Sequence, residues 1–117
     1  MAKEKVYDLE ERTFLFSRSC RKLVEKLPRT ISNIEDGKQL VRSSGSVGAN
    51  YIEANEKLGD KDLVFRLKIA RKEAKESKYW LRLLNSLNDC FEKEIEDLIQ
   101  EAEELRRILS SIINKTK

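Results

Sequence analysis

Histidine is absent from this 117-residue sequence, and proline, cysteine and aromatic residues are scarce. The lack of histidine removes the commonest general base and the commonest metal ligand. It also excludes the usual di-metal carboxylate bundles, which need a Glu-x-x-His motif. The two cysteines, Cys20 and Cys90, lack the spacing of a CxxC metal or redox motif, so we interpret each as a small core residue. We therefore expect no catalytic residues, no metal and no cofactor.

Long apolar runs are missing as well. No stretch of about 18 apolar residues is available to span a membrane. The charged first residues, MAKEKVYDLEE, lack the apolar core of a signal peptide. These features predict a cytoplasmic protein without a membrane partner. The length leaves room for one domain, residues 1–117.

The sequence is rich in charge and in helical periodicity. Charged residues make up 38% of the chain and apolar residues 39%, a mixture typical of helical bundles. Apolar residues recur at alternating steps of three and four in the first, third and fourth quarters, which predicts amphipathic helices. The predicted core positions are Val6, Leu9, Thr13, Phe16, Cys20, Leu23 and Leu27 in the first segment, Leu63, Leu67, Ala70, Ala74, Ser77, Leu81 and Leu84 in the third, and Ile95, Leu98, Ala102, Leu105, Leu109 and Ile112 in the fourth.

Helix-ending and helix-starting residues separate these segments. Pro28 ends the first helix, because proline cannot donate the backbone hydrogen bond of a continuing turn. Thr30 and Asp60 are predicted to be the N-caps of the second and third helices. With short connections near Pro28, Gly59 and residues 88–92, the sequence predicts an all-α, antiparallel up-down-up-down four-helix bundle.

The second segment contains an unusual stretch, RSSGSVGANYIEANE, at residues 42–56. Its GxxG sequence matches the loop of KH nucleic-acid-binding domains, but that fold also needs strands. We interpret the stretch as helix instead, because Ile34, Val41, Ser44, Gly48, Tyr51 and Asn55 keep the three-and-four spacing. Each glycine costs about 1 kcal/mol relative to alanine inside a helix. Such residues are kept where a neighbouring backbone or polar group approaches closely.

A polar ridge follows one side of this second helix, formed by Arg42, Ser46, Asn50 and Glu53. One interpretation is a solvated face. Another is a hydrogen-bonded network or interface that also includes Glu73 and Glu76 of the third helix. A third alternative, an enzyme, would use Glu53, Glu73 and Glu76 as ligands of a divalent metal.

The outer side of the third helix carries a second pattern, which we call the basic stripe: Lys61, Phe65, Lys68, Lys72, Lys75, Tyr79 and Arg82. Cations can neutralise phosphates, and aromatic rings can stack on unpaired bases. The alternative is a solvated face with both rings in a subunit contact. Ile69, Trp80 and Leu83 widen the apolar sector of this helix beyond what one core requires, which favours self-association.

Residues 42–56 and the stretch IARKEAKESKYWLRLL, residues 69–84, resemble the small bacterial bundle proteins related to the 23S ribosomal RNA intervening-sequence protein. The resemblance covers nearly the whole chain. It implies a left-handed antiparallel four-helix bundle that assembles as a homopentamer and has no established catalytic activity. A related branch, the accessory variability proteins of diversity-generating retroelements, works with a reverse transcriptase and nucleic acid through a basic pentameric surface.

Two functions therefore remain open at this stage. The first is a non-catalytic oligomer that binds RNA or DNA without sequence specificity through the basic stripe. The second is a protein-binding scaffold that uses the small-residue second helix or the acidic fourth helix. The acidic residues concerned are Glu92, Glu94, Glu96, Asp97, Glu101, Glu103 and Glu104.

Overall fold

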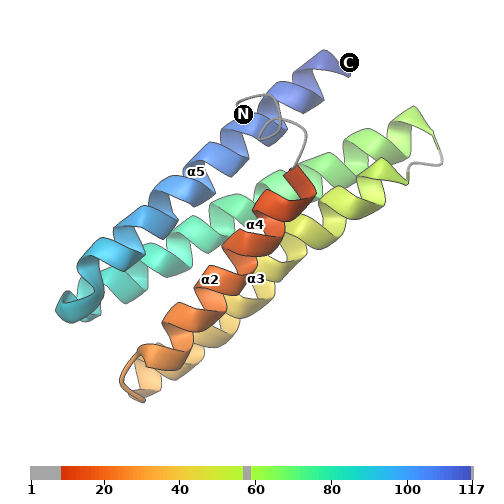
Figure 1. The fold of residues 1–117 in the computed structure, drawn as a ribbon. Helices are drawn as coiled ribbons and strands as arrows, with labels where there is room; N and C mark the ends of the chain where they lie inside the picture. The colour runs from red at the N-terminus through yellow and green to blue at the C-terminus, as the bar shows by residue number, and fades with distance from the viewer. Residues whose placement is uncertain (1–8, 57–58, 117) are drawn as a thin grey trace.

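Four long helices make up the structure, a computed structural model that describes residues 9–56 and 59–116 (Figure 1). They are α2 (Leu9–Lys26), α3 (Ile31–Asn55), α4 (Asp60–Leu87) and α5 (Glu92–Lys115), with a short 3-10 turn, η1 (Asp89–Phe91), before α5. No strand occurs within the described residues. The expected all-α arrangement of four helices packed together is confirmed.

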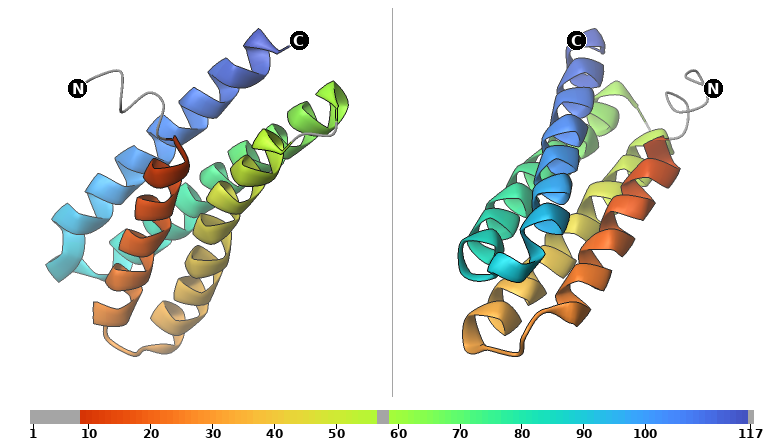
Figure 2. Two further views of the ribbon diagram at one scale, coloured as in Figure 1. Left: turned by 45° about the vertical axis from the view of Figure 1, so that its right-hand side comes forward. Right: turned by 60° about the vertical axis from the view of Figure 1, so that its left-hand side comes forward.

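Each helix packs against two others. α3 lies between α2 and α4, and α5 lies between α4 and α2 (Figure 2). The α2–α3 and α4–α5 connections lie at the same end of the molecule, as all three views show (Figures 1 and 2). The helices therefore surround one shared interior, into which each contributes an apolar side.

The helix ends follow local signals. α2 ends two residues before Pro28, and the Thr30 hydroxyl accepts a hydrogen bond from the Asn33 amide at 3.0 Å, so the predicted N-cap at Thr30 is confirmed. The predicted N-cap at Asp60 is displaced by one residue. Gly59 occupies the cap position there, and α4 begins at Asp60 itself.

The interior of the bundle is formed largely by the predicted apolar positions. Every predicted core position of α2 within the described residues is buried; Val6 lies outside them. The positions predicted for α4 are also buried, except that Leu63 is only half-buried. In α5 the inward face ends on Ile113, which is 1% exposed, while the predicted Ile112 is half-buried.

The two cysteines have different environments. Cys20 is fully buried in the core, and this burial raises the pKa of its thiol to about 12, against an opposing hydrogen bond with Ser44. Cys90 lies in η1 and is exposed, so its prediction as a core residue is wrong. The position sits in the connection between α4 and α5, where no helical period could indicate which way a side chain points.

The glycine- and serine-rich stretch lies within one continuous helix, α3, as predicted. The predicted inward positions of α3 were only partly right, because Ile34, Val41 and Tyr51 are half-buried and Asn55 is exposed. The side that faces the interior instead includes Leu40, Val47 and Ala54, with Asn33, Gly37, Ser43, Ser44 and Gly48 also buried. A helix with small residues on several sides gives little apolar contrast, so its inward direction was misjudged by about one residue.

Two glycines of α3 permit a close approach of α2. A Cβ atom at Gly48 would lie 2.9 Å from Thr13 Oγ1 and 3.2 Å from Thr13 Cβ. At Gly37 it would lie 2.9 Å from Val24 Cγ1. Such contacts are closer than packed side-chain atoms tolerate. Close helix packing therefore explains why α3 keeps residues that weaken a helix.

Buried polar pairs connect α3 with α4. Asn33 and Asn88 exchange two side-chain hydrogen bonds of 2.9 Å, and their remaining amide hydrogens are donated to the carbonyls of Pro28 and Leu84. Farther along, the hydroxyls of Ser43 and Ser77 lie 2.8 Å apart. Fully satisfied buried groups of this kind fix the register of one helix against another.

Candidate nucleic-acid interface

The outward side of α4 carries the basic stripe. All seven of its side chains are exposed. On the opposite side of the same helix, Leu67, Ala70, Ala74 and Leu81 are completely buried. The amphipathic pattern of α4 thus separates a closed inner face from an outer face that carries five cations and two aromatic rings.

Two hollows lie along the basic stripe and share Lys68. One has a volume of about 390 Å³ and is lined by Lys61, Val64, Phe65 and Lys68. The other, of about 330 Å³, is lined by Lys68, Arg71, Lys72, Lys75 and Glu76. The first hollow offers an aromatic and apolar surface between two ammonium groups, and the second is surrounded mainly by cations.

Arg71 is a cation of this surface that the sequence interpretation missed. It follows Lys68 by three residues and precedes Lys75 by four, so helical spacing could have identified it. Its guanidinium donates a hydrogen bond of 3.3 Å to the Ser110 hydroxyl, which holds the side chain between α4 and α5.

Few carboxylates neutralise the basic stripe. Lys72 lies 3.9 Å from Glu76, a contact at the edge of ion-pair distance between exposed groups. Lys61, Lys68, Lys75 and Arg82 form no ion pair within residues 9–56 and 59–116. Their charges are therefore directed at solvent.

The two rings of the basic stripe are well exposed. Phe65 is 58% exposed and Tyr79 54% exposed, so much of each ring is open to contact from outside. The Arg66 guanidinium lies 6.0 Å from the Phe65 ring centre. Tyr79 packs edge-on against Trp80, with ring centres 5.1 Å apart and planes at 72°. Each ring is thus held from one side by a neighbour on α4.

The acidic residues of α5 are used differently, because many of them pair within the bundle. Arg12 of α2 donates two hydrogen bonds to Glu101, of 2.7 and 2.9 Å, and one of 2.6 Å to Glu104. Both acceptors raise the pKa of the Arg12 guanidinium, and the hydrogen bond to Glu101 has the larger effect. Lys26 contacts Glu94 at 2.6 Å, and Lys93 contacts Asp97 at 2.8 Å.

Glu103 is the most strongly paired of the α5 carboxylates. It accepts hydrogen bonds from Arg106 at 2.5 Å, Arg107 at 3.1 Å and Lys78 of α4 at 3.3 Å. These donors lower the pKa of Glu103 from 4.5 to about 2, and the hydrogen bond from Arg106 has the largest effect. The carboxylate is therefore ionised at any physiological pH and joins α4 to α5.

The polar ridge of α3 is only partly brought together. The Asn50 side chain donates hydrogen bonds of 2.9 Å to the backbone carbonyl and the hydroxyl of Ser46. Arg66 of α4 donates one of 3.2 Å to the side-chain oxygen of Asn50. Arg42 and Glu53 are exposed and make no hydrogen bond within the described part of the chain. Arg66, seven residues before Glu73, was not among the predicted members.

Glu73 stands out among the predicted residues because it is only 8% exposed, and its Oε1 atom has no hydrogen-bond partner among the described residues. Burial, and then the nearby charge of Glu76, raise the pKa of Glu73, while Lys72 and Arg42 act in the opposite direction. Arg42 and Glu73 are thus electrostatic neighbours across α3 and α4. Glu76 is half-buried and contacts Lys72 rather than the polar ridge.

The structure also bears on metal and membrane binding. Within residues 9–56 and 59–116, no three His, Cys, Asp or Glu side chains are grouped so that they could hold a metal ion. Glu53, Glu73 and Glu76 are accordingly not grouped as ligands. In the same residues, no helix has both the length and the apolar character needed to cross a bilayer.

Comparison with known proteins places this arrangement in a family. The model of the family described as 23S rRNA-intervening sequence protein matches residues 5–111. The chain belongs to this family. The resemblance noted in residues 42–56 and 69–84 is therefore confirmed. No curated protein sequence matches the chain.

A solved structure shares the fold. It is a protein of unknown function from the S23 ribosomal protein family of Bacteroides thetaiotaomicron, with 29% sequence identity and a TM-score of 0.78. The similarity covers 89% of this chain and 96% of the other. The agreement over almost the full length of both chains indicates that the bundle described here is the common architecture of the two proteins.

Proposed function

We propose that this member of the 23S rRNA-intervening sequence protein family is a non-catalytic protein that binds nucleic acid, without sequence specificity, through the basic stripe of α4. The observation that supports this most strongly is the exposure of all seven side chains, with four of the five cations unpaired within the described residues. The stripe extends over roughly 30 Å of helix, at 1.5 Å per residue. A strand lying along α4 would meet three successive lysines with one aromatic ring on either side of them.

Single strands suit this surface better than duplexes. Lys68, Lys72 and Lys75 would neutralise phosphates, and Phe65 and Tyr79 would stack on unpaired bases, which a duplex keeps inside its helix. None of the elements formed by residues 9–56 and 59–116 resembles a groove-reading module, so binding without sequence preference is expected.

The proposal includes self-association, as a cytoplasmic homopentamer of left-handed, up-down-up-down bundles, each formed by residues 1–117. Self-association is supported by apolar side chains that remain accessible, among them Leu87, which is 64% exposed, and half-buried Ile69, Trp80 and Leu83 on the flank of α4. The subunit number is the one that the family resemblance implies. Several copies on one ring would multiply weak contacts with a strand through avidity.

The direct test is a binding titration of the purified protein with a fluorescent single-stranded RNA of mixed sequence, monitored by anisotropy at low salt. We expect saturable binding, with similar affinity for a second RNA of unrelated sequence. The absence of binding at low salt would contradict the proposal.

The alternative, a protein-binding scaffold, has less support. The small residues of α3 face other helices of the same chain, as shown by the Gly48–Thr13 approach and the Ser43–Ser77 contact. Glu94, Asp97, Glu101, Glu103 and Glu104 of α5 already pair with cations of the bundle. A pull-down from native lysate that recovered one protein after nuclease treatment would favour the scaffold over nucleic-acid binding.

A further inference from the structure

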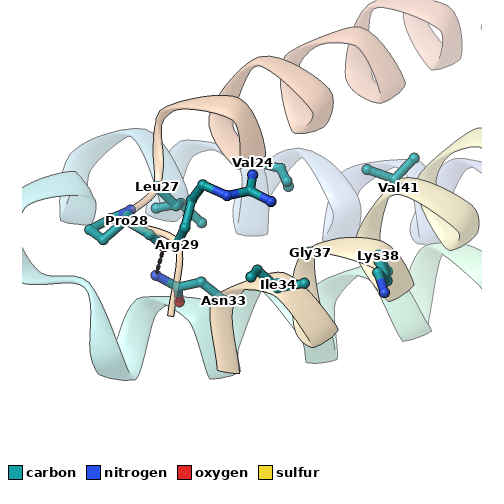
Figure 3. A pocket seen from close by; sticks show the side chains of 9 residues that line it. All are labelled: Val24, Leu27, Pro28, Arg29, Asn33, Ile34, Gly37, Lys38 and Val41. Carbon is teal, nitrogen blue, oxygen red and sulfur yellow. Dashed lines mark hydrogen bonds between the residues drawn. The ribbon is translucent and has the colours of Figure 1, made fainter. Parts of the chain in front are cut away.

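A separate hollow of about 360 Å³ lies at the α2–α3 end of the bundle, away from the basic stripe. Its walls are mostly apolar and come from the last turn of α2, the connection at Pro28, and the first three turns of α3 (Figure 3). The lining residues are Val24, Leu27, Pro28, Arg29, Asn33, Ile34, Gly37, Lys38 and Val41. None of them belongs to the basic stripe or the polar ridge.

The polar groups of this hollow divide into satisfied and available ones. The Asn33 amide is fully occupied by Pro28 and Asn88, and the Pro28 carbonyl accepts hydrogen bonds from Asn33 and from the Thr30 amide. Arg29 makes no hydrogen bond or ion pair within the described residues. Among the described residues, the one ion-pair contact of Lys38 is with the exposed carboxylate of Glu35, at 3.8 Å.

The polar side chains at the hollow that keep unused hydrogen-bonding capacity, Arg29 and Lys38, are both cations. Figure 3 shows the Arg29 side chain extending from the connection along the hollow toward Val24, with Ile34 and Val41 on the α3 side. None of the nine described residues that line the hollow carries a carboxylate. A ligand that fits would bring an apolar body for the valine, leucine and isoleucine side chains and an anionic group for a cation at the rim.

The size of the hollow favours a small molecule over a protein segment. Its volume is near the lower end of the roughly 300–1,000 Å³ typical of small-molecule pockets. Stable protein interfaces use about 20–30 residues on each side, whereas nine residues line this hollow. Gly37 contributes bare backbone to the wall of the hollow. A Cβ atom there would lie 2.9 Å from Val24 Cγ1, so α2 and α3 are in close contact at this point.

We propose that the hollow between α2 and α3 binds a small organic carboxylate with an apolar chain, whose carboxylate pairs with Arg29 while its chain contacts Val24, Leu27, Ile34 and Val41. This site is independent of nucleic-acid binding. Either proposal can fail without the other, because the two surfaces share no residue.

The test is a titration of the full chain with sodium octanoate, followed through the methyl NMR signals of valine, leucine and isoleucine. We expect saturable shifts confined to Val24, Leu27, Ile34 and Val41. Affinity should rise roughly fourfold for each methylene group added from butanoate to octanoate, because each buried methylene contributes a similar amount of transfer free energy. Octanol and octylammonium, which have the same chain without the negative charge, should bind at least about fivefold more weakly.

A matched pair of variants tests the role of charge. Arg29→Gln should weaken octanoate binding about fivefold, since a partly exposed charged hydrogen bond is lost. Arg18→Gln, at an exposed arginine of α2 that does not line the hollow, should leave binding unchanged. Unfolding curves of both variants should overlay that of the unaltered protein, because neither side chain is paired within the described residues.

Three results would overturn the proposal. The first is an absence of saturation with millimolar octanoate. The second is equal affinity for octanol and octanoate, which would show an apolar surface that does not recognise the carboxylate. The third is self-association that octanoate does not affect and that Arg29→Gln abolishes. This result would show that a second copy of the chain occupies the hollow.

Discussion

The outer faces of α4 and α5 differ less in the number of their charges than in how those charges are used. Residues 60–88 contain eight Lys or Arg and four Asp or Glu, and residues 89–117 contain five and eight. On α5, Glu101, Glu103 and Glu104 pair with cations of the bundle. On α4, Lys61, Lys68, Lys75 and Arg82 face solvent without ion pairs in the described residues.

This comparison shows that charge patterns of similar density can serve different purposes. The α5 acids hold α2 and α4 in place through Arg12 and Lys78, so removing them should change stability. The cations of the basic stripe make few contacts within the bundle, so removing them should change binding rather than stability. The following predictions use this contrast.

Charge reversal on α4 should have the largest effect. Changing Lys68, Lys72 and Lys75 together to Glu should abolish binding of single-stranded RNA, because the cationic hollow becomes anionic. The control is a triple variant with the same net charge change, Arg18→Glu, Lys22→Glu and Lys115→Glu, all at exposed positions outside the basic stripe. Anisotropy titrations measure RNA binding by the two variants. An equal loss of binding in both would contradict the assignment of the binding surface to α4.

Removal of the Phe65 ring should have the next largest effect. Phe65→Ala should weaken binding of single-stranded RNA about tenfold, since base–aromatic stacking contributes about 1–3 kcal/mol per base. Binding of a duplex of equal length should change little, because its bases are not free to stack. Exposed Phe14 of α2, 61% accessible, offers the matched control Phe14→Ala. Equal losses for single strand and duplex would argue against stacking.

On α5, the expected change is in stability and its pH dependence. Glu103→Gln should lower the free energy of unfolding by about 1–2 kcal/mol near neutral pH through lost charged hydrogen bonds. The folded-state pKa of Glu103, about 2, lies below its ordinary 4.5, so this stabilisation is complete above about pH 4.5 and is lost as the pH falls toward 2.

The variant should therefore show less acid destabilisation than the unaltered protein over that pH window. Urea unfolding at a series of pH values measures this difference directly. Glu96→Gln, at an exposed α5 position without an ion pair in the described residues, is the control. Parallel pH profiles for the unaltered protein and Glu103→Gln would show that the Glu103 cluster does not stabilise the fold.

The smallest effect is expected for the stability of an α4 cation variant. Lys75→Gln should change the unfolding free energy by less than about 0.5 kcal/mol, as for most exposed positions without partners. The same urea titration as for Glu103→Gln provides the comparison. A loss as large as that of Glu103→Gln would erase the distinction between the two helices.

The helices and much of the core could be predicted from the sequence because large apolar residues in α2, α4 and α5 contrast strongly with charged neighbours. Pro28 and Thr30 marked a helix end and a helix start for simple stereochemical reasons. In α3 that contrast is weak, so the spacing does not predict the inward side, which is formed by Leu40, Val47 and Ala54.

The candidate site was less accessible to prediction than the fold. Helical spacing alone placed the basic stripe residues on one face of α4, but it could not show which cations are paired. Spacing could have added Arg71 to this surface, but it could not show that Arg66 and Arg71 reach Asn50 and Ser110 on neighbouring helices. Contacts of this kind depend on which helices are adjacent, and the pattern of a single helix does not contain that information.

The salt dependence of single-stranded RNA binding tests the central claim, that exposed α4 cations neutralise phosphates, most directly. With the five cations Lys61, Lys68, Lys72, Lys75 and Arg82 available, and about 0.7 counterions released per phosphate contact on a single strand, the logarithm of the binding constant should fall against log salt with a slope of about −2 to −4 per subunit. A slope near zero would contradict the account, because binding would then proceed without phosphate neutralisation.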